Sequence, residues 1–177
     1  MIPQLIGEKH RMLIFSQWTR CLDLLGCLLD TMDIRYLRLD GQTDIKERQT
    51  LIDQYTNDET IPIFLLSTRA GGMGINLTAA DTCILHDLDF NPFNDLQAED
   101  RVHRIGQKKL VTVIKMVTEN TVDSDIYKMQ ERKAKMNAAI LETKLSTSAT
   151  KKKEKDEANG IIKMAISRYN SEKTSNK

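Results

Sequence analysis

Two arginines stand close together in the segment QAEDRVHRIGQ, which covers residues 97–107. Arg101 and Arg104 are three positions apart, so on a helix their side chains share one face. Two guanidinium groups on one face can bind a polyphosphate whose charge grows in a transition state. A salt-bridged surface helix is the alternative interpretation, because Glu99 and Asp100 adjoin the arginines. The segment by itself does not decide between the two.

A second segment with anion-binding chemistry, STRAGGMGIN at residues 67–76, follows a continuous apolar run. Two hydroxyl groups and Arg69 precede a cluster of three glycines, which allow backbone amides to approach a ligand closely. Such chemistry suits phosphate oxygens. The segment is neither a Walker A loop, since no GKS or GKT follows, nor a GxGxxG motif. A flexible surface turn is the other interpretation.

A third segment, DGQT at residues 40–43, forms a predicted tight turn at the start of a helix, with Thr43 as N-cap. Free amides and the helix dipole attract anions at such a position. Without further support, a capped helix start explains the same residues.

The elements that must position these segments alternate between strands and helices. Short apolar runs predict strands, and apolar residues at helical spacing predict helices. This alternation predicts an α/β fold whose parallel sheet has helices on both faces, with strands buried on both sides. Ligands bind such sheets at the carboxyl ends of the strands, here the loops after Phe15, Leu39, Leu66 and His86. The expected strands cover residues 12–15, 36–39, 61–66, 82–86 and 111–116, and the helices 18–32, 45–55, 94–105, stopping at Gly106, and 122–141.

Length and composition fit one globular domain, since 40% of the 177 residues are apolar and 29% are charged. The net charge is +1, but nine Lys/Arg and four Asp/Glu from Lys144 onward leave about −4 on the body. Any nucleic-acid surface on the body must therefore be local. We predict a leader at 1–10, a main lobe at 11–120, a helix at 121–143 and a basic, disordered tail at 144–177. A partner-docking helix near 161–169 is the alternative for that tail.

Cysteine usage indicates neither disulfides nor a metal site. Cys21, Cys27 and Cys83 lack CxxC spacing, and we expect all three to be reduced core residues of an intracellular protein. The sequence has no signal-like apolar start and no apolar run of membrane length, so we expect a soluble protein.

Five motifs taken together resemble the second-lobe motifs of the SWI/SNF-like, helicase-related ATPases. They are FSQWT (15–19), YLRLDG (36–41), LSTRAGGMGINLTAAD (66–81), DFNPFND (89–95) and QAEDRVHRIGQ, in that order. The resemblance covers about residues 8 to 140, and the run from His86 to Gln107 is most similar to the Etl/SMARCAD-type branch. It implies a RecA-like, P-loop NTPase helicase C-terminal lobe. In this family ATP binds between two such lobes, and duplex DNA runs across both.

By this resemblance, Arg101 and Arg104 are arginine fingers, and Gln97 couples them to the first lobe. The residues implied near the nucleotide are Gly72, Gly74 and Asn76. Those implied on the DNA are Gln17, Gly41, Thr43, Thr68, Arg69 and Phe90.

Other features of the motifs carry further expectations. Phe90 stands where many members have Trp, which keeps an apolar wedge but removes the indole N–H from a minor-groove contact. His103 is expected to be a buried structural residue. The helix at 122–141 resembles a brace that docks on the first lobe through Ile126, Met129, Met136 and Ile140.

The resemblance implies ATP and Mg²⁺ as cofactors, both held mainly by a first lobe. The sequence has no GxxxxGK[ST] loop and no DExH box, so we expect this chain alone not to hydrolyse ATP. It would be a fragment of a longer ATPase or a product that lacks its partner lobe.

We predict that the chain serves as the second lobe of a nuclear, ATP-dependent double-stranded DNA translocase that remodels nucleosomes. Its partners would be duplex DNA, nucleosomes and a first lobe in cis or in trans, and no membrane. The main alternative is a non-catalytic scaffold that binds DNA or an ATPase. A metabolic nucleotide-binding protein is disfavoured, because no complete nucleotide fingerprint is present.

Overall fold

The computed structural model describes residues 1–71 and 75–143, with side chains to residue 136. The predicted tail at 144–177, the glycines Gly72 and Gly74 and the side chain of Ile140 lie outside the described residues. The chain divides into two compact units. The first comprises Met1–Asp89 with Phe93–Met116, and the second comprises Phe90–Pro92 with the chain from Val117 onward.

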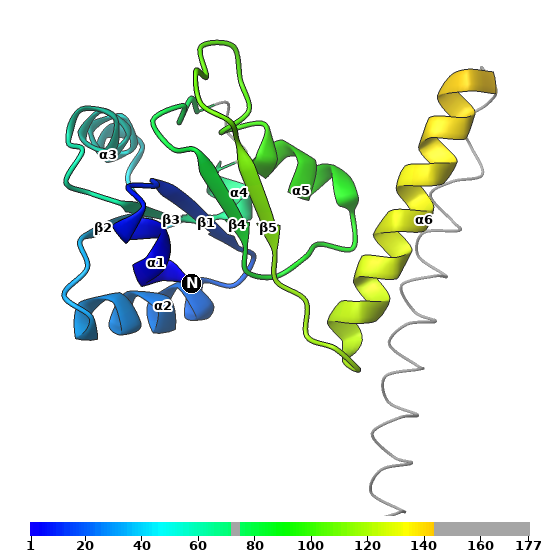
Figure 1. Cartoon of the computed structure of the whole chain (residues 1–177), viewed down its shortest axis with the longest axis horizontal. Helices are drawn as coiled ribbons and strands as arrows, with labels where there is room; N and C mark the ends of the chain where they lie inside the picture. The colour runs from blue at the N-terminus through cyan, green and yellow to red at the C-terminus, as the bar shows by residue number, and fades with distance from the viewer. Residues whose placement is uncertain (72–74, 144–177) are drawn as a thin grey trace, which may run out of the picture. The chain divides into compact units, whose positions relative to one another are not determined.

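A five-stranded parallel sheet forms the centre of the first unit, in the order β2-β3-β1-β4-β5 (Figure 1). All four pairs of neighbouring strands run parallel, which confirms the predicted sheet. The strands are β1 Met12–Ser16, β2 Tyr36–Leu39, β3 Ile63–Ser67, β4 Thr82–Leu85 and β5 Thr112–Lys115.

Several of the described helices differ from the sequence prediction. The helices are α1 Ile2–Gly7, α2 Thr19–Thr31, α3 Ile45–Asn57, α4 Thr68–Gly71, α5 Pro92–Glu99 and α6 Val122–Thr143. The predicted leader contains α1. The helix expected to run to residue 105 ends as α5 at Glu99, and turns follow it. The N-cap of α3 is Asp44, whose carboxylate accepts from the Lys46 amide, and not Thr43 as predicted.

One face of the sheet packs against α1 and α2. Met12, Ile14 and Ile84 of the sheet share a buried cluster with Leu22 and Leu29 of α2, and apolar residues of α1 pack against the same cluster. The heptad-like spacing of Leu22 and Leu29 places both on one side of α2. The leucine spacing in the sequence thus predicts which face of α2 is buried.

The opposite face packs against α3 and α5. The Tyr55 ring of α3 lies 5.1 Å from the Phe64 ring of β3, centroid to centroid. Lys115 of β5 forms an ion pair with Glu99 of α5, with its Nζ 3.0 Å from the carboxylate. Helices therefore cover both faces, as predicted. Three of the four residues of the edge strand β5 are nonetheless exposed, because this strand has only one neighbour.

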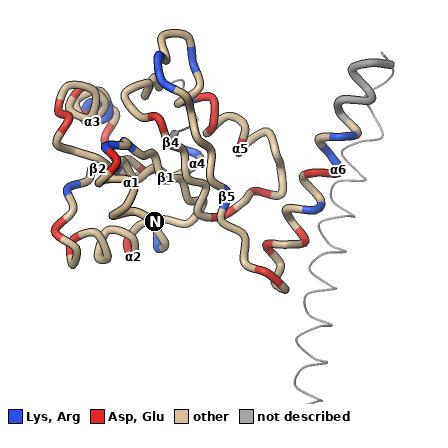
Figure 2. The backbone as a smooth tube through the Cα atoms, viewed as in Figure 1, with Lys and Arg blue, Asp and Glu red and all other residues tan. Residues whose placement is uncertain are grey.

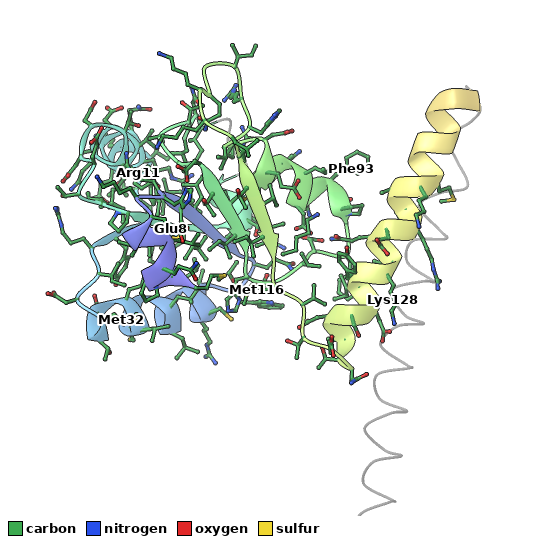
Figure 3. All side chains as sticks on the ribbon, in the orientation of Figure 1. Glu8, Arg11, Met32, Phe93, Met116 and Lys128 are labelled. Carbon is green, nitrogen blue, oxygen red and sulfur yellow. The ribbon has the colours of Figure 1, made fainter. Side chains whose placement is uncertain are left out.

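A buried arginine ties the start of β1 to the end of α3. Arg11, labelled in Figure 3, is 8% exposed, and its guanidinium lies over the Tyr55 ring at 4.2 Å. It donates to the carbonyls of Tyr55, Asp58 and Ile61. Two of these acceptors lie at the carboxyl end of α3, where a cation is favourable.

Helix α6 belongs to the second unit, and acidic and basic residues alternate along it (Figure 2). The Nζ atom of Lys133 donates to the Phe90 carbonyl at 3.3 Å. Ile126 and Met129 of the predicted docking face are buried, whereas Met136 is 42% exposed. None of the helices in the described part of the chain is long and apolar enough to span a membrane.

Candidate functional site

A pocket of about 720 Å³ lies at the carboxyl ends of β1, β2 and β3. Its position follows from the topology, because parallel strands bring their carboxyl ends to one edge of the sheet. Five of the residues predicted to act on DNA or to couple the lobes meet here. The lining residues are Gln17, Trp18, Thr19, Gly41, Ser67, Thr68, Arg69, Asp89, Asn94 and Gln97.

Gln17 is held in the pocket wall by contacts from both its backbone and its side chain. Its amide donates to an oxygen of the Asp87 carboxylate at 2.8 Å, and its Nε2 donates to the Leu88 carbonyl at 2.9 Å. Although burial opposes the effect, hydrogen bonds from His86, Ser16 and the Gln17 amide lower the pKa of Asp87 below its usual value. Asp87 is therefore ionised near neutrality and anchors the loop after β1 to the loop after β4.

The turn that contributes Gly41 is fixed by the buried side chain of Asp40. One Asp40 oxygen accepts from the Gln42 amide at 2.8 Å, and the other lies 2.8 Å from a guanidinium nitrogen of Arg38. Burial alone would raise the pKa of Asp40, but these partners lower it. The hydroxyl of Thr43 accepts from the Asp40 amide at 3.0 Å. Thr43 thus closes the turn, and among the described residues it does not line the pocket.

Thr68 and Arg69 begin the short helix α4 directly after β3. The Ser67 hydroxyl accepts from the Ala70 amide at 3.3 Å and so closes this first turn. Arg69 is exposed, and within the part of the chain that the structure describes no hydrogen bond or ion pair involves its guanidinium. The same pocket contains Asp89, whose carboxylate accepts from the Asn94 side chain at 2.8 Å. Arg69 is the cationic group of this pocket and Asp89 the acidic one.

Arg101 and Arg104 lie in the turns after α5, where the structure brings them beside residues 75–77. The Arg104 guanidinium donates to the Ile75 carbonyl at 3.4 Å, and the Leu77 amide donates to the Arg101 carbonyl at 3.3 Å. The expected helical face is wrong, because α5 ends at Glu99. Both arginines therefore contact residues 75–77, which follow the glycine segment in the sequence. Neither arginine lines the pocket that contains Gln97.

Gln107, which the sequence analysis did not select, fastens this arginine loop, residues 100–107, to the segment after the glycines. Its Nε2 donates to the carbonyls of Ala80 at 2.7 Å, Thr78 at 3.2 Å and Val102 at 3.2 Å. Val102, which belongs to this loop, is fully buried. The preceding Gly106 has a φ of +104°, which favours glycine and turns the chain so that Gln107 points inward.

Three further predicted residues have different surroundings. His103 is exposed, so the expected buried structural role is wrong. Asn76 is exposed next to Ile75. Phe90 is half-buried and belongs to the second unit.

The sequence analysis also missed Trp18, which is 62% exposed at the rim of the pocket. An apolar indole left in solvent beside polar pocket residues is a feature of interaction surfaces. The available signal was the aromatic residue directly after Gln17 in the motif FSQWT.

A second cavity, of about 640 Å³, lies at the other end of the sheet. Its lining includes Lys9, Lys108 and Lys109, and basic residues of the loop between α5 and β5 are visible in Figure 2. Lys109 pairs with the buried Asp81 at 3.3 Å, so part of this positive charge is neutralised locally. Of the residues predicted from the sequence to act on DNA or nucleotide, none lines this cavity among those described.

Comparison with known protein families gives a match over more than half of the chain. Residues 1–106 match the model of the helicase conserved C-terminal domain. The chain belongs to this family. As a helicase C-terminal domain, it has the RecA-like fold that the sequence analysis predicted.

Known relatives of this helicase C-terminal domain are SWI/SNF-like remodellers. Protein CHROMATIN REMODELING 19 of Arabidopsis thaliana is 54% identical over 143 residues, covering 81% of this chain and 19% of that protein. A Drosophila melanogaster protein, named as a homolog of the SWI/SNF-related regulator of chromatin subfamily A containing DEAD/H box 1, is 49% identical over 140 residues. That match covers 79% of this chain and 17% of the relative. The chain therefore spans less than a fifth of the length of these relatives.

A solved structure supports the same assignment. The crystal structure of the C-terminal part of the Fun30 ATPase domain matches 71% of this chain and 41% of its own, with a TM-score of 0.69 and 44% identity. The predicted resemblance to SWI/SNF-like and SMARCAD-type proteins is thereby confirmed.

Proposed function

We propose that this domain is the second lobe of a nuclear, ATP-dependent translocase on double-stranded DNA that remodels nucleosomes, and that its carboxyl-edge pocket faces the DNA backbone. The observation that carries the proposal is the convergence of Gln17, Gly41, Thr68, Arg69 and Gln97 on one pocket. These residues come from four separate stretches of the sequence.

The chemistry of the pocket suits a phosphodiester backbone. Amide, hydroxyl and guanidinium donors bind phosphate oxygens without reading base sequence, as a translocase requires. Gly41 has nothing within 4 Å of the position that a Cβ would take, which leaves its backbone open to a strand. The exposed Trp18 supplies an apolar surface that can pack against sugars at the rim.

The arginine loop would face ATP presented by a first lobe. Arg104 is exposed and Arg101, three residues earlier, is half-buried, so one side of this loop is open to a partner domain. When bound, ATP supplies the phosphoryl group that is transferred to water. Arg101 and Arg104 would hold and neutralise its phosphates, and Asn76 lies next to Ile75, whose carbonyl accepts from Arg104.

Mg²⁺ does not fit the side chains described in this lobe. Mg²⁺ takes oxygen ligands in an octahedron, whereas the one group of three metal-ligating side chains found among the described residues offers sulfur, nitrogen and oxygen. Its ligands would therefore come from the first lobe, together with the Walker lysine. The isolated chain should consequently show no DNA-stimulated ATP hydrolysis.

Duplex binding by the 177-residue chain tests the proposal directly. Fluorescence anisotropy with a labelled duplex should give a salt-dependent affinity, and Arg69→Ala should weaken it about tenfold and lower the salt slope by about 1. Arg35→Ala is the matched control, because Arg35 is also exposed but precedes β2 at the opposite edge of the sheet. Equal losses in both variants, or no binding by the unaltered chain, would contradict the proposal.

A further inference from the structure

Three side chains with metal-ligating atoms meet beside the pocket, although the sequence predicted no metal site. Cys21 lies in the first turn of α2, and His86 and Asp87 directly follow β4. One ligand atom of each lies within 4.8 Å of the other two. All three side chains are half-buried, so a hydrated ion can reach them.

The set of atoms has the chemistry of a zinc site. Thiolate, imidazole and carboxylate are the ligands that Zn²⁺ takes in proteins, and the soft sulfur disfavours Mg²⁺ and Ca²⁺. The Nδ1 atom of His86 lies 3.4 Å from the Oδ2 atom of Asp87. Tetrahedral Zn²⁺ with bonds of about 2.0 Å places a nitrogen and an oxygen ligand about 3.3 Å apart. In this structure the two atoms are hydrogen-bonded to each other, so a Zn²⁺ ion would replace the proton between them at nearly the same separation.

Neighbouring groups hold the carboxylate in place, as the outer partners of metal ligands do. The Ser16 hydroxyl donates to Oδ2 of Asp87 at 2.5 Å, and the Gln17 amide donates to Oδ1 at 2.8 Å. Ser16 is fully buried at the end of β1, so this support is rigid. Oδ1 of Asp87 keeps a second lone pair for a cation, whereas Oδ2 already accepts from Ser16 and is hydrogen-bonded to Nδ1 of His86.

The other cysteines in the described chain lack these partners. Cys27 is exposed further along α2, and Cys83 is buried within β4. Burial raises the pKa of the Cys83 thiol to about 12, which keeps it protonated. Of the three thiols, only that of Cys21 belongs to a group of described residues able to hold a metal ion.

We propose that Cys21, His86 and Asp87 form a three-ligand Zn²⁺ site with an open fourth position, which pins the start of α2 to the loop after β4. Binding converts the Cys21 thiol to a thiolate and releases its proton. The ion would sit on the network that fixes Gln17, so it would stiffen the wall of the DNA-facing pocket. The metal site itself does not depend on the proposed DNA function.

Titration of the full 177-residue chain with Co²⁺ and then Zn²⁺ tests this site. Co²⁺ should bind at one equivalent and give the near-ultraviolet sulfur-to-metal charge-transfer band, and Zn²⁺ should abolish it by displacement. Cys21→Ser should remove the band and lower Zn²⁺ affinity at least tenfold, whereas Cys27→Ser, the matched control on the same helix, should retain both. His86→Asn should also weaken metal binding at least tenfold. The charge-transfer band should persist at reduced intensity, because the Cys21 thiolate is still present.

Far-ultraviolet circular dichroism of each variant separates loss of the site from loss of the fold. Cys21→Ser removes no side-chain hydrogen bond found among the described residues, and the variant should remain folded. Absence of the charge-transfer band in the unaltered chain would overturn the proposal. Its persistence in folded Cys21→Ser, or its loss in Cys27→Ser alone, would do the same.

Discussion

The side-chain amide of Gln107 donates to the Ala80 carbonyl at 2.7 Å, and this hydrogen bond joins the arginine loop to the segment that precedes β4. The same nitrogen also reaches the carbonyls of Thr78 and Val102. Its oxygen accepts from the Lys109 amide at 2.9 Å. One neutral side chain therefore satisfies backbone groups on both sides of the loop, which makes Gln107 a positioning residue for Arg101 and Arg104.

Replacement of Gln107 by Ala should loosen the arginine loop. The Leu77 amide, which donates to the Arg101 carbonyl, should then exchange its hydrogen about tenfold faster, because local opening of the loop becomes easier. Gln49→Ala is the matched control, since the described hydrogen bond of the Gln49 side chain is to the exposed Asp53 on its own helix. Hydrogen exchange followed by NMR measures both. An unchanged Leu77 rate in folded Gln107→Ala would show that the hydrogen bonds of Gln107 do not restrain the loop.

Arg104 should act on ATP hydrolysis when the domain is joined to a first lobe. In such a two-lobe enzyme, Arg104→Ala should lower kcat about 10³-fold, because an arginine finger neutralises charge that grows on the transferred phosphoryl group. Arg104→Lys should recover little, since lysine lacks the planar fork. DNA affinity should stay within about twofold of the unaltered enzyme, because Arg104 does not line the pocket that we propose to face DNA.

The control for that measurement is Arg132→Ala, which removes an exposed arginine from α6. Its kcat should match that of the unaltered enzyme. If the lobe is a non-catalytic scaffold, the joined protein will show no DNA-stimulated turnover at all, and Arg104→Ala will change nothing. The experiment therefore separates the translocase from the scaffold hypothesis.

Most of the fold could be predicted from the sequence because the strands are continuous apolar runs. Residues such as Ile14 and Phe64 are buried whichever way they point, so a short apolar stretch identifies them. The end of α5 was misjudged because Val102 and Ile105 continue the helical spacing. Val102 is indeed buried, but Ile105 is 98% exposed and lies in a turn. Spacing alone cannot distinguish a helix from turns with the same repeat.

The candidate site was predictable only in part. Gln17, Gly41 and Thr68 lie close together because parallel strands end at one edge of the sheet. The parallel topology was predicted from the sequence, so this part of the site was predicted with it. That Gln97 lines the pocket while Arg101 does not was not predictable, because it depends on where α5 ends. The role of Gln107 and the meeting of Cys21 with His86 depend on tertiary contacts between distant parts of the sequence, for which spacing rules offer no signal.

Protonation of Asp81 should lower the free energy of unfolding at acidic pH. It is buried at the start of β4, where its carboxylate accepts from His10, Thr82 and Lys109. Burial alone would raise its pKa, but these partners lower the pKa below the usual value. A carboxylate with a lowered folded pKa stabilises the fold above its unfolded pKa of about 4, and this contribution is lost as the pH falls through the folded pKa.

At pH 7, Asp81→Asn should therefore lower the free energy of unfolding by about 1–3 kcal/mol, so the variant unfolds at a lower urea concentration. Between pH 7 and pH 3 the variant should lose less stability than the unaltered chain. Asp53→Asn, at an exposed carboxylate that bonds only to Gln49, should follow the unaltered curve. Urea unfolding at both pH values measures the difference. Parallel pH profiles for Asp81→Asn and the unaltered chain would show that Asp81 is not the group that titrates.

Arg11 should be the most sensitive charged residue for stability among those described in the first unit. Its buried guanidinium donates to the carbonyls of Tyr55, Asp58 and Ile61. Arg11→Met keeps much of the apolar stem but removes the guanidinium from these carbonyls, of which only that of Asp58 is known to keep another donor, the Ile61 amide, so the free energy of unfolding should fall by about 3 kcal/mol. Arg11→Lys should recover only part of the lost stability, because a single ammonium group cannot reach all three carbonyls as the guanidinium does.

Urea denaturation of Arg11→Met, with Arg38→Met as control, measures this contribution. Arg38 also forms several hydrogen bonds, to Asp23 and Asp40, but its side chain is more exposed, and the buried Asp40 keeps the hydrogen bond from the Gln42 amide. The control should therefore lose about 1 kcal/mol or less. If Arg11→Met is as stable as Arg38→Met, the end of α3 must find other donors, and the buried arginine is not what joins α3 to β1.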